Sequence, residues 1–369
     1  MFVYGLGVGA PTVFIPQIRK EANSTSIITD EMASWISSIY SFSGFPSVII
    51  LSVITCFYGR KVPFTIAAVD SLAAFVVLYC STNPTQILIS ALMQGFLSAS
   101  QIVVSIMILT EYTSPEYRGI FLIIKSATFY WGVWVSNAIG TFFYWKNIPL
   151  FGIMCTVYII VTVMFWPESP YWLASKAKFK ECAASHRWLK GCGEESEKEL
   201  EALINSQKES FTPCGENMSA TRRPVHFFKT ITSKQFYKPT LLSFLTGIIS
   251  IFSGKLVCAV YALDILKKIT KTESTAYLAM LILDGITVFS MYLGCILAKY
   301  LRRRTLLLVP TSIGVFFLFA LSLYLYLITV DIIIENKYVS ILLLAVFSIA
   351  ISFGPLTMSV SIYGELIPV

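Results

Sequence analysis

The chain has 369 residues, of which 56% are hydrophobic and 13% charged, and its mean hydropathy is +0.71. So apolar a composition excludes an ordinary soluble enzyme and is typical of an integral membrane protein. The formal net charge of +7 does not indicate a nucleic-acid-binding protein, because most of the basic residues lie in the segments between apolar runs.

Apolar runs long enough to cross a bilayer recur along the chain. A membrane-spanning helix needs about 20 mostly apolar residues. The run Met1–Ile15 is shorter, lacks the basic start and cleavage site of a signal peptide, and is interpreted as an incomplete first span. Its glycines predict close helix contact, and Gly354-Pro355, much later in the chain, predicts a broken helix. Nine further runs are predicted as full spans: Ala33–Phe57, Val62–Ser81, Ile87–Leu109, Gly119–Tyr144, Ile148–Trp166, Pro239–Leu263, Ala276–Ala298, Thr305–Val330 and Tyr338–Pro355.

The basic residues fall on alternate sides of these spans. Arg60, Arg118, the long loop 167–238 and Arg302–Arg304 all lie on one side if each run crosses once. The positive-inside rule makes that side cytoplasmic. Asn23 begins an Asn-Ser-Thr glycosylation sequon on the opposite side, which agrees with this orientation.

The long loop opens with an abrupt change from apolar to charged residues. Pro167 ends the preceding helix, Ser169 suits an N-cap, and Pro170 suits the first helical position. Apolar residues at helical spacing within Phe179–Leu189 and Glu194–Glu209 predict two amphipathic helices.

The sequence carries few signs of metal binding, disulfide bonds, phosphate binding or catalysis. The eight cysteines and two histidines show no metal-ligand spacing or disulfide framework. The sequence offers no glycine-rich phosphate loop and no paired nucleophile and base. We therefore expect no enzymatic activity, no cofactor and no metal, and the partners that we expect are a small-molecule solute and the lipid bilayer, with no nucleic acid.

Five motifs stand in a fixed order along the chain: "GRK" at 59–61, "EYTSPEYRG" at 111–119, "PESPYWL" at 167–173, "RRRTLLL" at 302–308 and "GPLTMSVSIYGELIP" at 354–368. This set resembles the sugar porter family of the major facilitator superfamily, and "SWISSIYSF" with "YGELIP" resembles its insect trehalose-transporter-like branch. The resemblance implies an all-α bundle of two six-helix halves with substrate bound between them. It covers nearly the whole chain.

The resemblance also implies a domain organisation. Residues 1–166 correspond to the N-terminal transmembrane half with an incomplete first span, and residues 167–238 correspond to the cytoplasmic helical loop. Residues 239–369 correspond to the C-terminal half without its last two spans. About ten of the family's twelve spans are thus expected.

The resemblance further implies a cytoplasmic gate of ion pairs that closes when the carrier faces outward. An alternative is that these charges only set the topology and snorkel to the membrane surface. In the family, an acidic and a basic residue precede the glycine of the motif that reads "GRK" here. These positions are Cys56 and Phe57 in this chain, which weakens the interpretation as a gate. The candidate gate residues are Arg60, Glu111, Arg118, Glu168, Arg303, Arg304 and Glu365.

The expected sugar site departs from the family more strongly. Amide side chains and a stacking aromatic ring suit sugar hydroxyls and C–H faces. Here the amide-bearing motif of span seven reads "SIFSGKL" at 250–256, and the aromatic position falls on Met358 or Val360. The candidate cavity residues are Ser126, Ser250, Ser253, Lys255, Asp284 and Met358.

Charged residues inside predicted spans are functional hypotheses. Lys255 and Asp284 could bind a polar or anionic solute, or pair with each other. Lys125 is expected to snorkel toward the cytoplasm. Proton-coupled members of the family carry an acid in span one, and Met1–Ile15 has none, which favours passive carriage.

These observations predict a plasma-membrane transporter of the sugar porter type, with the loop 167–238 cytoplasmic. It would move a sugar or similar small polar solute by alternating access, as facilitated diffusion. Two alternatives stay open: a non-transporting membrane sensor or degenerate paralogue, and a carrier of a non-sugar solute.

Overall fold

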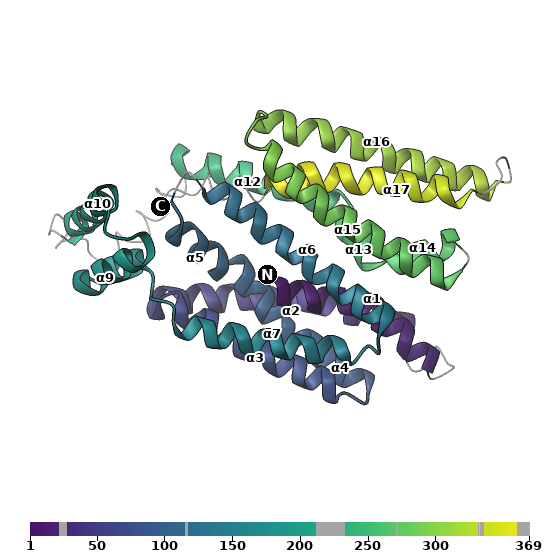
Figure 1. Ribbon diagram of the computed structural model, residues 1–369, viewed down its shortest axis with the longest axis horizontal. Coiled ribbons are helices and arrows are strands. Elements are labelled where there is room, and N and C mark those ends of the chain that lie inside the picture. The colour runs from purple at the N-terminus through teal and green to yellow at the C-terminus, as the bar shows by residue number, and fades with distance from the viewer. Residues whose placement is uncertain are drawn as a thin grey trace.

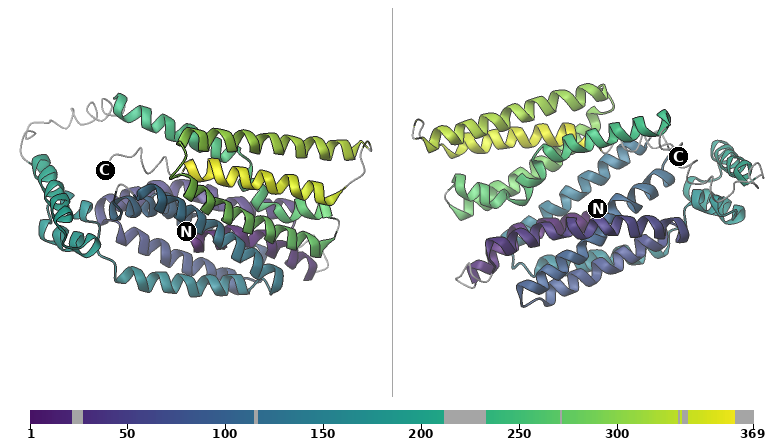
Figure 2. Two further views of the ribbon diagram at one scale, coloured as in Figure 1. Left: turned by 45° about the horizontal axis from the view of Figure 1, so that its top comes forward. Right: turned by 180° about the vertical axis from the view of Figure 1, so that it is seen from behind.

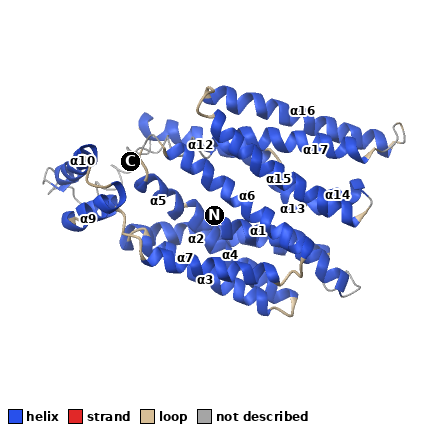
Figure 3. Ribbon diagram, viewed as in Figure 1, coloured by secondary structure: helices blue, strands red, loops and turns tan. Residues whose placement is uncertain are grey.

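A computed structural model describes residues 1–21, 28–114, 117–211, 233–270, 272–330, 332 and 336–359. Over these residues the chain forms helices joined by loops and turns (Figure 3). The helices make two groups that lie against each other, with a smaller set of helices beside one end (Figure 1). We call that end of the bundle the loop end. The predicted glycosylation site Asn23 and gate residue Glu365 lie outside the described residues.

The first group contains the helices that precede the long loop: α1 (Phe2–Glu21), α2 (Asp30–Tyr58), α3 (Lys61–Cys80), α4 (Pro84–Ile102), α5 (Val104–Tyr112), α6 (Arg118–Phe142) and α7 (Asn147–Met164). The set beside the loop end contains α8 (Pro170–Ser175), α9 (Phe179–Lys190) and α10 (Glu194–Phe211).

The second group follows the loop: α12 (Lys234–Phe252), α13 (Lys255–Val260), α14 (Ala262–Thr270), α15 (Glu273–Leu297), α16 (Arg303–Thr329), α17 (Lys337–Ile351) and the π-helix η1 (Ser352–Leu356). Helix α15 lies next to α6 (Figure 1). Seen from behind, the second group again lies along one side of the first (Figure 2).

The predicted spans are confirmed. Within the described residues, nine helices are long and apolar enough to cross a membrane, and each overlaps one predicted run. Many of their apolar side chains point outward, as expected for a lipid-facing surface; Phe45 is 76% exposed and Phe289 is 71% exposed.

The run Met1–Ile15 belongs to a longer helix than its apolar length suggests. Helix α1 continues to Glu21 and carries Arg19 and Lys20 in its last turn. Basic side chains there are stabilised by the negative end of the helix dipole. Helix α1 lies in the interior, where Leu6 and Val13 are completely buried. It contacts helices of both groups, including α6 and α13.

Glycines permit the close approach of α1 to α6, as predicted. A Cβ on Gly5 would lie 2.0 Å from the carbonyl oxygen of Phe129, and one on Gly132 would lie 2.1 Å from the carbonyl oxygen of Phe2. A side chain at either position would therefore push the two backbones apart. This close contact draws α1 against α6, next to the surface where the two groups meet.

Among the described residues, three spans are interrupted. Helix α4 stops before α5 at Val103, and α12 stops before α13 at Gly254, whose φ is +75°. The last described span changes to a π-helix around Pro355, which confirms the break predicted at Gly354–Pro355. Such breaks leave backbone carbonyls without helical partners inside the spans, where other polar groups can bind them.

The loop helices also follow their prediction. The hydroxyl of Ser169 accepts a hydrogen bond from the backbone N–H of Trp172 at 3.4 Å, so Ser169 caps α8, and Pro170 is its first residue. The apolar faces of α9 and α10 pack together, with Cys182 and Leu200 buried against α8. Helices α8, α9 and α10 therefore form a small packed unit.

Candidate functional site

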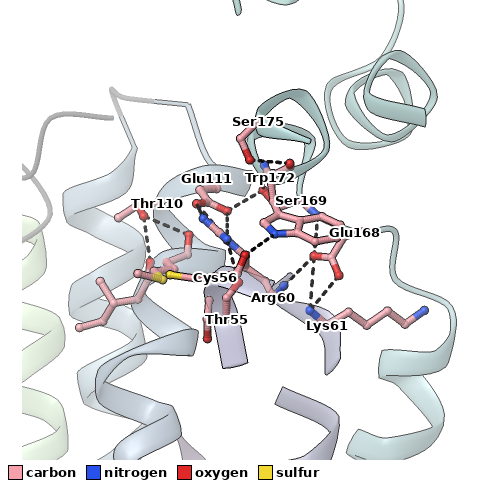
Figure 4. A network of polar contacts seen from close by, with 12 residues as sticks. Thr55, Cys56, Arg60, Lys61, Thr110, Glu111, Glu168, Ser169, Trp172 and Ser175 are labelled. Carbon is pink, nitrogen blue, oxygen red and sulfur yellow. Dashed lines mark hydrogen bonds and ion pairs between the residues drawn. The ribbon is translucent and has the colours of Figure 1, made fainter. Parts of the chain in front are cut away.

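A network of ionic and polar side chains lies at the loop end of the first group (Figure 4). Arg60 stands in the turn between α2 and α3, and its guanidinium group binds Glu111 at the end of α5. Nη2 of Arg60 is 2.7 Å from Oε1 of Glu111, and Nε is 3.0 Å from Oε2. The two side chains are only 16% and 10% exposed. This two-point, charge-assisted contact fixes both position and orientation.

Glu168 binds backbone instead of an arginine side chain. Its carboxylate accepts N–H groups from Arg60 at 2.8 Å, from Ser169 at 2.9 Å and from Lys61 at 3.2 Å. Gly59 makes this possible, because its φ is +88° and a Cβ there would lie 2.6 Å from Oε2 of Glu168. The carboxylate thus satisfies the free N–H groups at the start of α3.

Further contacts join the network to α8. The hydroxyl of Ser169 donates to Oε2 of Glu111 at 2.6 Å, and the indole N–H of Trp172 donates to the carbonyl of Cys56 at 3.3 Å (Figure 4). Tyr112 donates its hydroxyl to the carbonyl of Pro167 at 2.7 Å. Sequence reasoning missed Ser169 and Tyr112 as network members, although both belong to motifs that it had identified.

Not every predicted gate residue belongs to this network. Arg60, Glu111 and Glu168 are brought together, all within the first group and its connection to α8. Arg118, at the start of α6, donates to the carbonyl of Thr113 at 3.4 Å. Arg303 and Arg304 lie exposed in the first turn of α16, in the second group. A gate formed between the two groups stays a prediction.

Polar contacts between the groups lie deeper in the spans. Nδ2 of Asn137 in α6 donates to Oδ2 of Asp284 in α15 at 2.6 Å. The indole N–H of Trp131 in α6 donates to the hydroxyl of Tyr292 in α15 at 3.1 Å. Both contacts join the first group to the second in the part of the spans where unpaired polar groups are costly.

The groups are also joined toward the end opposite the loop. The hydroxyl of Thr12 in α1 donates to the carbonyl of Val260 in α13 at 3.1 Å. At the far end, Glu273 in α15 lies 3.5 Å from the ammonium of Lys20 and 3.0 Å from that of Lys267. Lys20 belongs to the first group and Lys267 to the second, so the carboxylate joins both.

Lys255 and Asp284 do not pair with each other, so that interpretation was wrong. Lys255 is only 5% exposed, and its ammonium donates to the hydroxyl of Thr287 at 2.7 Å. Asp284 is held by Asn137. Because Asp284 and Thr287 stand three residues apart on α15, they share one face of that helix. The ammonium therefore lies on the face of α15 that also contacts α6.

The expectation for Lys125 was also wrong. This side chain is 7% exposed and its ammonium donates to the carbonyl of Gln101 at 2.7 Å. Gln101 stands just before the break between α4 and α5, where a carbonyl is available to a side-chain donor. The lysine therefore turns into the first group rather than toward the membrane surface.

The other cavity candidates have smaller roles in this structure. Ser253 donates to the carbonyl of Ser250 at 2.6 Å, at the end of α12. Ser126 is half-buried on α6. Met358 is 1% exposed and packs with Ile123 and Leu306 in an apolar cluster between the groups. Its side chain therefore contributes packing where the resemblance implied a sugar-stacking ring.

Comparison with known proteins decides the family. The family described as "Sugar (and other) transporter" matches residues 1–369. The chain belongs to this family. Its all-α membrane fold and its motifs are thereby accounted for, and it is a membrane transporter of the sugar porter type.

Relatives within the transporter family include insect proteins. The facilitated trehalose transporter Tret1 of Apis mellifera ligustica is 24% identical over 352 residues, which are 95% of this chain and 68% of that protein. The protein of the same name from Bombyx mori is 24% identical over 376 residues, or 99% of this chain and 70% of the relative. These matches confirm the resemblance to the insect trehalose-transporter-like branch.

Solved structures confirm the fold. The partially occluded inward open conformation of the xylose transporter XylE from E. coli has a TM-score of 0.74 at 14% identity. The match covers 99% of this transporter chain and 88% of that one. At this identity the likeness establishes the major facilitator architecture. The solute has to be inferred from the chemistry of the site.

Proposed function

We propose that this transporter moves a sugar or a similar small polar solute across the plasma membrane by alternating access, as facilitated diffusion. The observation that carries the proposal is the contact between Asn137 and Asp284, 2.6 Å apart, which joins the two groups inside their spans. Polar and ionisable groups at this depth are costly unless they serve a solute pathway or bind each other.

Solute sites of this architecture lie near the midplane, between two units that move against each other. We assign residues 1–166 and 239–369 to these units and residues 167–238 to a connecting loop on the cytoplasmic side. The basic residues at the loop end support that orientation. The insect relatives' description as facilitated trehalose transporters supports passive carriage of a sugar.

The contacts of the structure fit the state in which the pathway is closed opposite the loop. Thr12 binds the carbonyl of Val260 and Glu273 binds Lys20 across the groups toward that end. The bond between Arg60 and Glu111 at the loop end stays within the first group and would keep that unit rigid while the two units rock.

Uptake of radiolabelled trehalose and glucose by oocytes that express the full chain tests the proposal. We expect saturable uptake that falls about tenfold or more in Asp284→Leu, because one buried polar partner is lost and the other is left unsatisfied. Phe289→Leu is the matched control, since Phe289 lies on the same helix and is 71% exposed. Absence of saturable uptake, with the protein confirmed at the cell surface, would overturn the proposal.

One observation favours a second function, that of a non-transporting sensor. Met358 fills the position expected of a sugar-stacking ring and is buried in an apolar cluster between the groups. A sensor would bind solute without moving it. Saturable binding to purified protein, together with no uptake into cells or proteoliposomes, would establish this function in place of transport.

A further inference from the structure

Lys255 stands at an interruption of the span that it belongs to. Helix α12 ends at Phe252, and Gly254, with a φ of +75°, turns the chain before α13 begins at Lys255. The side chain is 5% exposed, so its charge is held away from water. A buried ammonium needs either a counter-ion or several hydrogen-bond acceptors to offset the loss of hydration.

The described contacts supply little of that compensation. An ammonium group has three N–H donors, and one of them binds the hydroxyl of Thr287 at 2.7 Å. The ion pairs between described residues do not include Lys255. Asp284 is near enough to influence it electrostatically, but its carboxylate is held by Asn137 instead. Donor capacity of Lys255 is therefore left for another acceptor.

The ammonium also lies beside the surface where the two groups meet. Its partner Thr287 shares a face of α15 with Asp284, and Asp284 contacts the first group through Asn137. Neutral hydroxyl groups could accept hydrogen bonds from Lys255, but they would add no negative charge beyond the influence of Asp284, which is held by Asn137. A carboxylate would satisfy both the donors and the charge.

We propose that Lys255 makes this transporter selective for solutes that carry a carboxylate, with sugar acids as the substrate class. This inference rests on the proposed function and adds the chemical class of the solute. The carboxylate would bind the ammonium beside Thr287, and the hydroxyl groups of the solute would meet the polar side chains at the surface between the two groups.

Uptake of radiolabelled D-glucuronate and D-glucose, measured side by side in oocytes that express the full chain, tests the inference. We expect a preference for glucuronate that falls about tenfold or more in Lys255→Met, the usual effect of losing a charge-assisted hydrogen bond. Lys255→Arg should retain most of the preference. Lys125→Met is the matched control, because Lys125 is a buried lysine that binds the carbonyl of Gln101; the ratio of the two uptakes should stay within about twofold of wild type.

A second measurement needs no variant. The methyl ester of glucuronate has nearly the same shape without the charge, so the unmodified protein should take it up about tenfold less than glucuronate. Glucose uptake without a preference for glucuronate over its ester would overturn this inference and leave the proposed function standing. No uptake of either sugar would overturn both.

Discussion

The guanidinium group of Arg60 holds the carboxylate of Glu111 at two points, with N–O distances of 2.7 and 3.0 Å. The pair joins the turn between α2 and α3 to the end of α5, and the hydroxyl of Ser169 binds the same carboxylate from the start of α8. Three segments distant in sequence are thereby held in one arrangement at the loop end.

Removing both members of this pair should cost less stability than the two single losses added together. Arg60→Gln or Glu111→Gln leaves a mostly buried charge without its partner, at a cost of about 3 kcal/mol. The double variant leaves no such charge, so its loss should be smaller than the sum of the single losses by about 1 kcal/mol or more. The thermal midpoints of the detergent-solubilised variants, monitored by size-exclusion chromatography, compare the losses of stability.

The exposed pair of Lys178 and Glu181 serves as the control for this cycle. Their side chains are 51% and 60% exposed and the N–O distance is 3.2 Å. Lys178→Gln should change stability by no more than about 0.5 kcal/mol. Strictly additive losses for Arg60 and Glu111 would show that the two-point contact contributes nothing of its own.

Two glycines with similar backbone angles should respond differently to alanine. Gly59 and Gly191 have φ values of +88° and +76°, so Ala costs about 1–3 kcal/mol of backbone strain at either position. At Gly59 the added Cβ also lies 2.6 Å from Oε2 of Glu168, whereas at Gly191 nothing lies within 4 Å. Gly59→Ala should therefore lower the midpoint further than Gly191→Ala, and equal shifts would contradict a role for Gly59 in seating Glu168.

Close packing between α1 and α6 should make Gly132 intolerant of any side chain. A Cβ there would lie 2.1 Å from the carbonyl oxygen of Phe2, which is backbone and cannot turn aside. Gly132→Ala should cost about 3 kcal/mol through separation of the helices. Gly285→Ala is the control, because its nearest neighbour is a ring atom of Trp134 at 3.6 Å. Similar folded yields and midpoints for the two variants would refute the close contact.

The loop helices should lose stability in mildly acidic solution. Burial, reinforced by the charge of Lys190, lowers the pKa of His186 below its ordinary value, against the opposing pull of Glu199 and Glu197. The unfolded loop therefore takes up a proton at a higher pH than the folded loop. The stabilising contribution is complete above the unfolded pKa of about 6.5 and is lost as pH falls through that value toward the folded pKa.

Hydrogen exchange of α9, corrected for the intrinsic rate, measures this effect. Protection should be lower at about pH 5.5 than at about pH 7.5, and His186→Gln should remove most of the difference. The exposed ion pair of Arg187 and Glu197 titrates at lower pH, since the pKa of Glu197 is lowered by Arg187. A pH dependence that survives in His186→Gln would assign the effect to another group.

Much of the fold could be predicted because the bilayer imposes a simple requirement. A span must be long, apolar and helical so that its backbone groups bind one another, and nine runs met that requirement. The cap at Ser169 and the break around Pro355 are local effects of single residues, so they too could be predicted. The motif residues Arg60, Glu111 and Glu168 were grouped together only through the resemblance to the sugar porter family.

Tertiary structure decided which partner each polar group takes. Composition placed Lys125, Lys255 and Asp284 inside spans, but hydropathy does not say which way a helix is turned. The packing of the helices directs the Lys125 ammonium inward, where it binds a backbone carbonyl at a helix break. The same packing places Asp284 against Asn137 rather than against Lys255. The sequence by itself therefore determined that this chain is a membrane-spanning transporter. Which charges lie along the surface where the two groups meet was decided only by contacts between helices distant in sequence. Those contacts depend on the rotation of each helix and on the close approach that glycines permit.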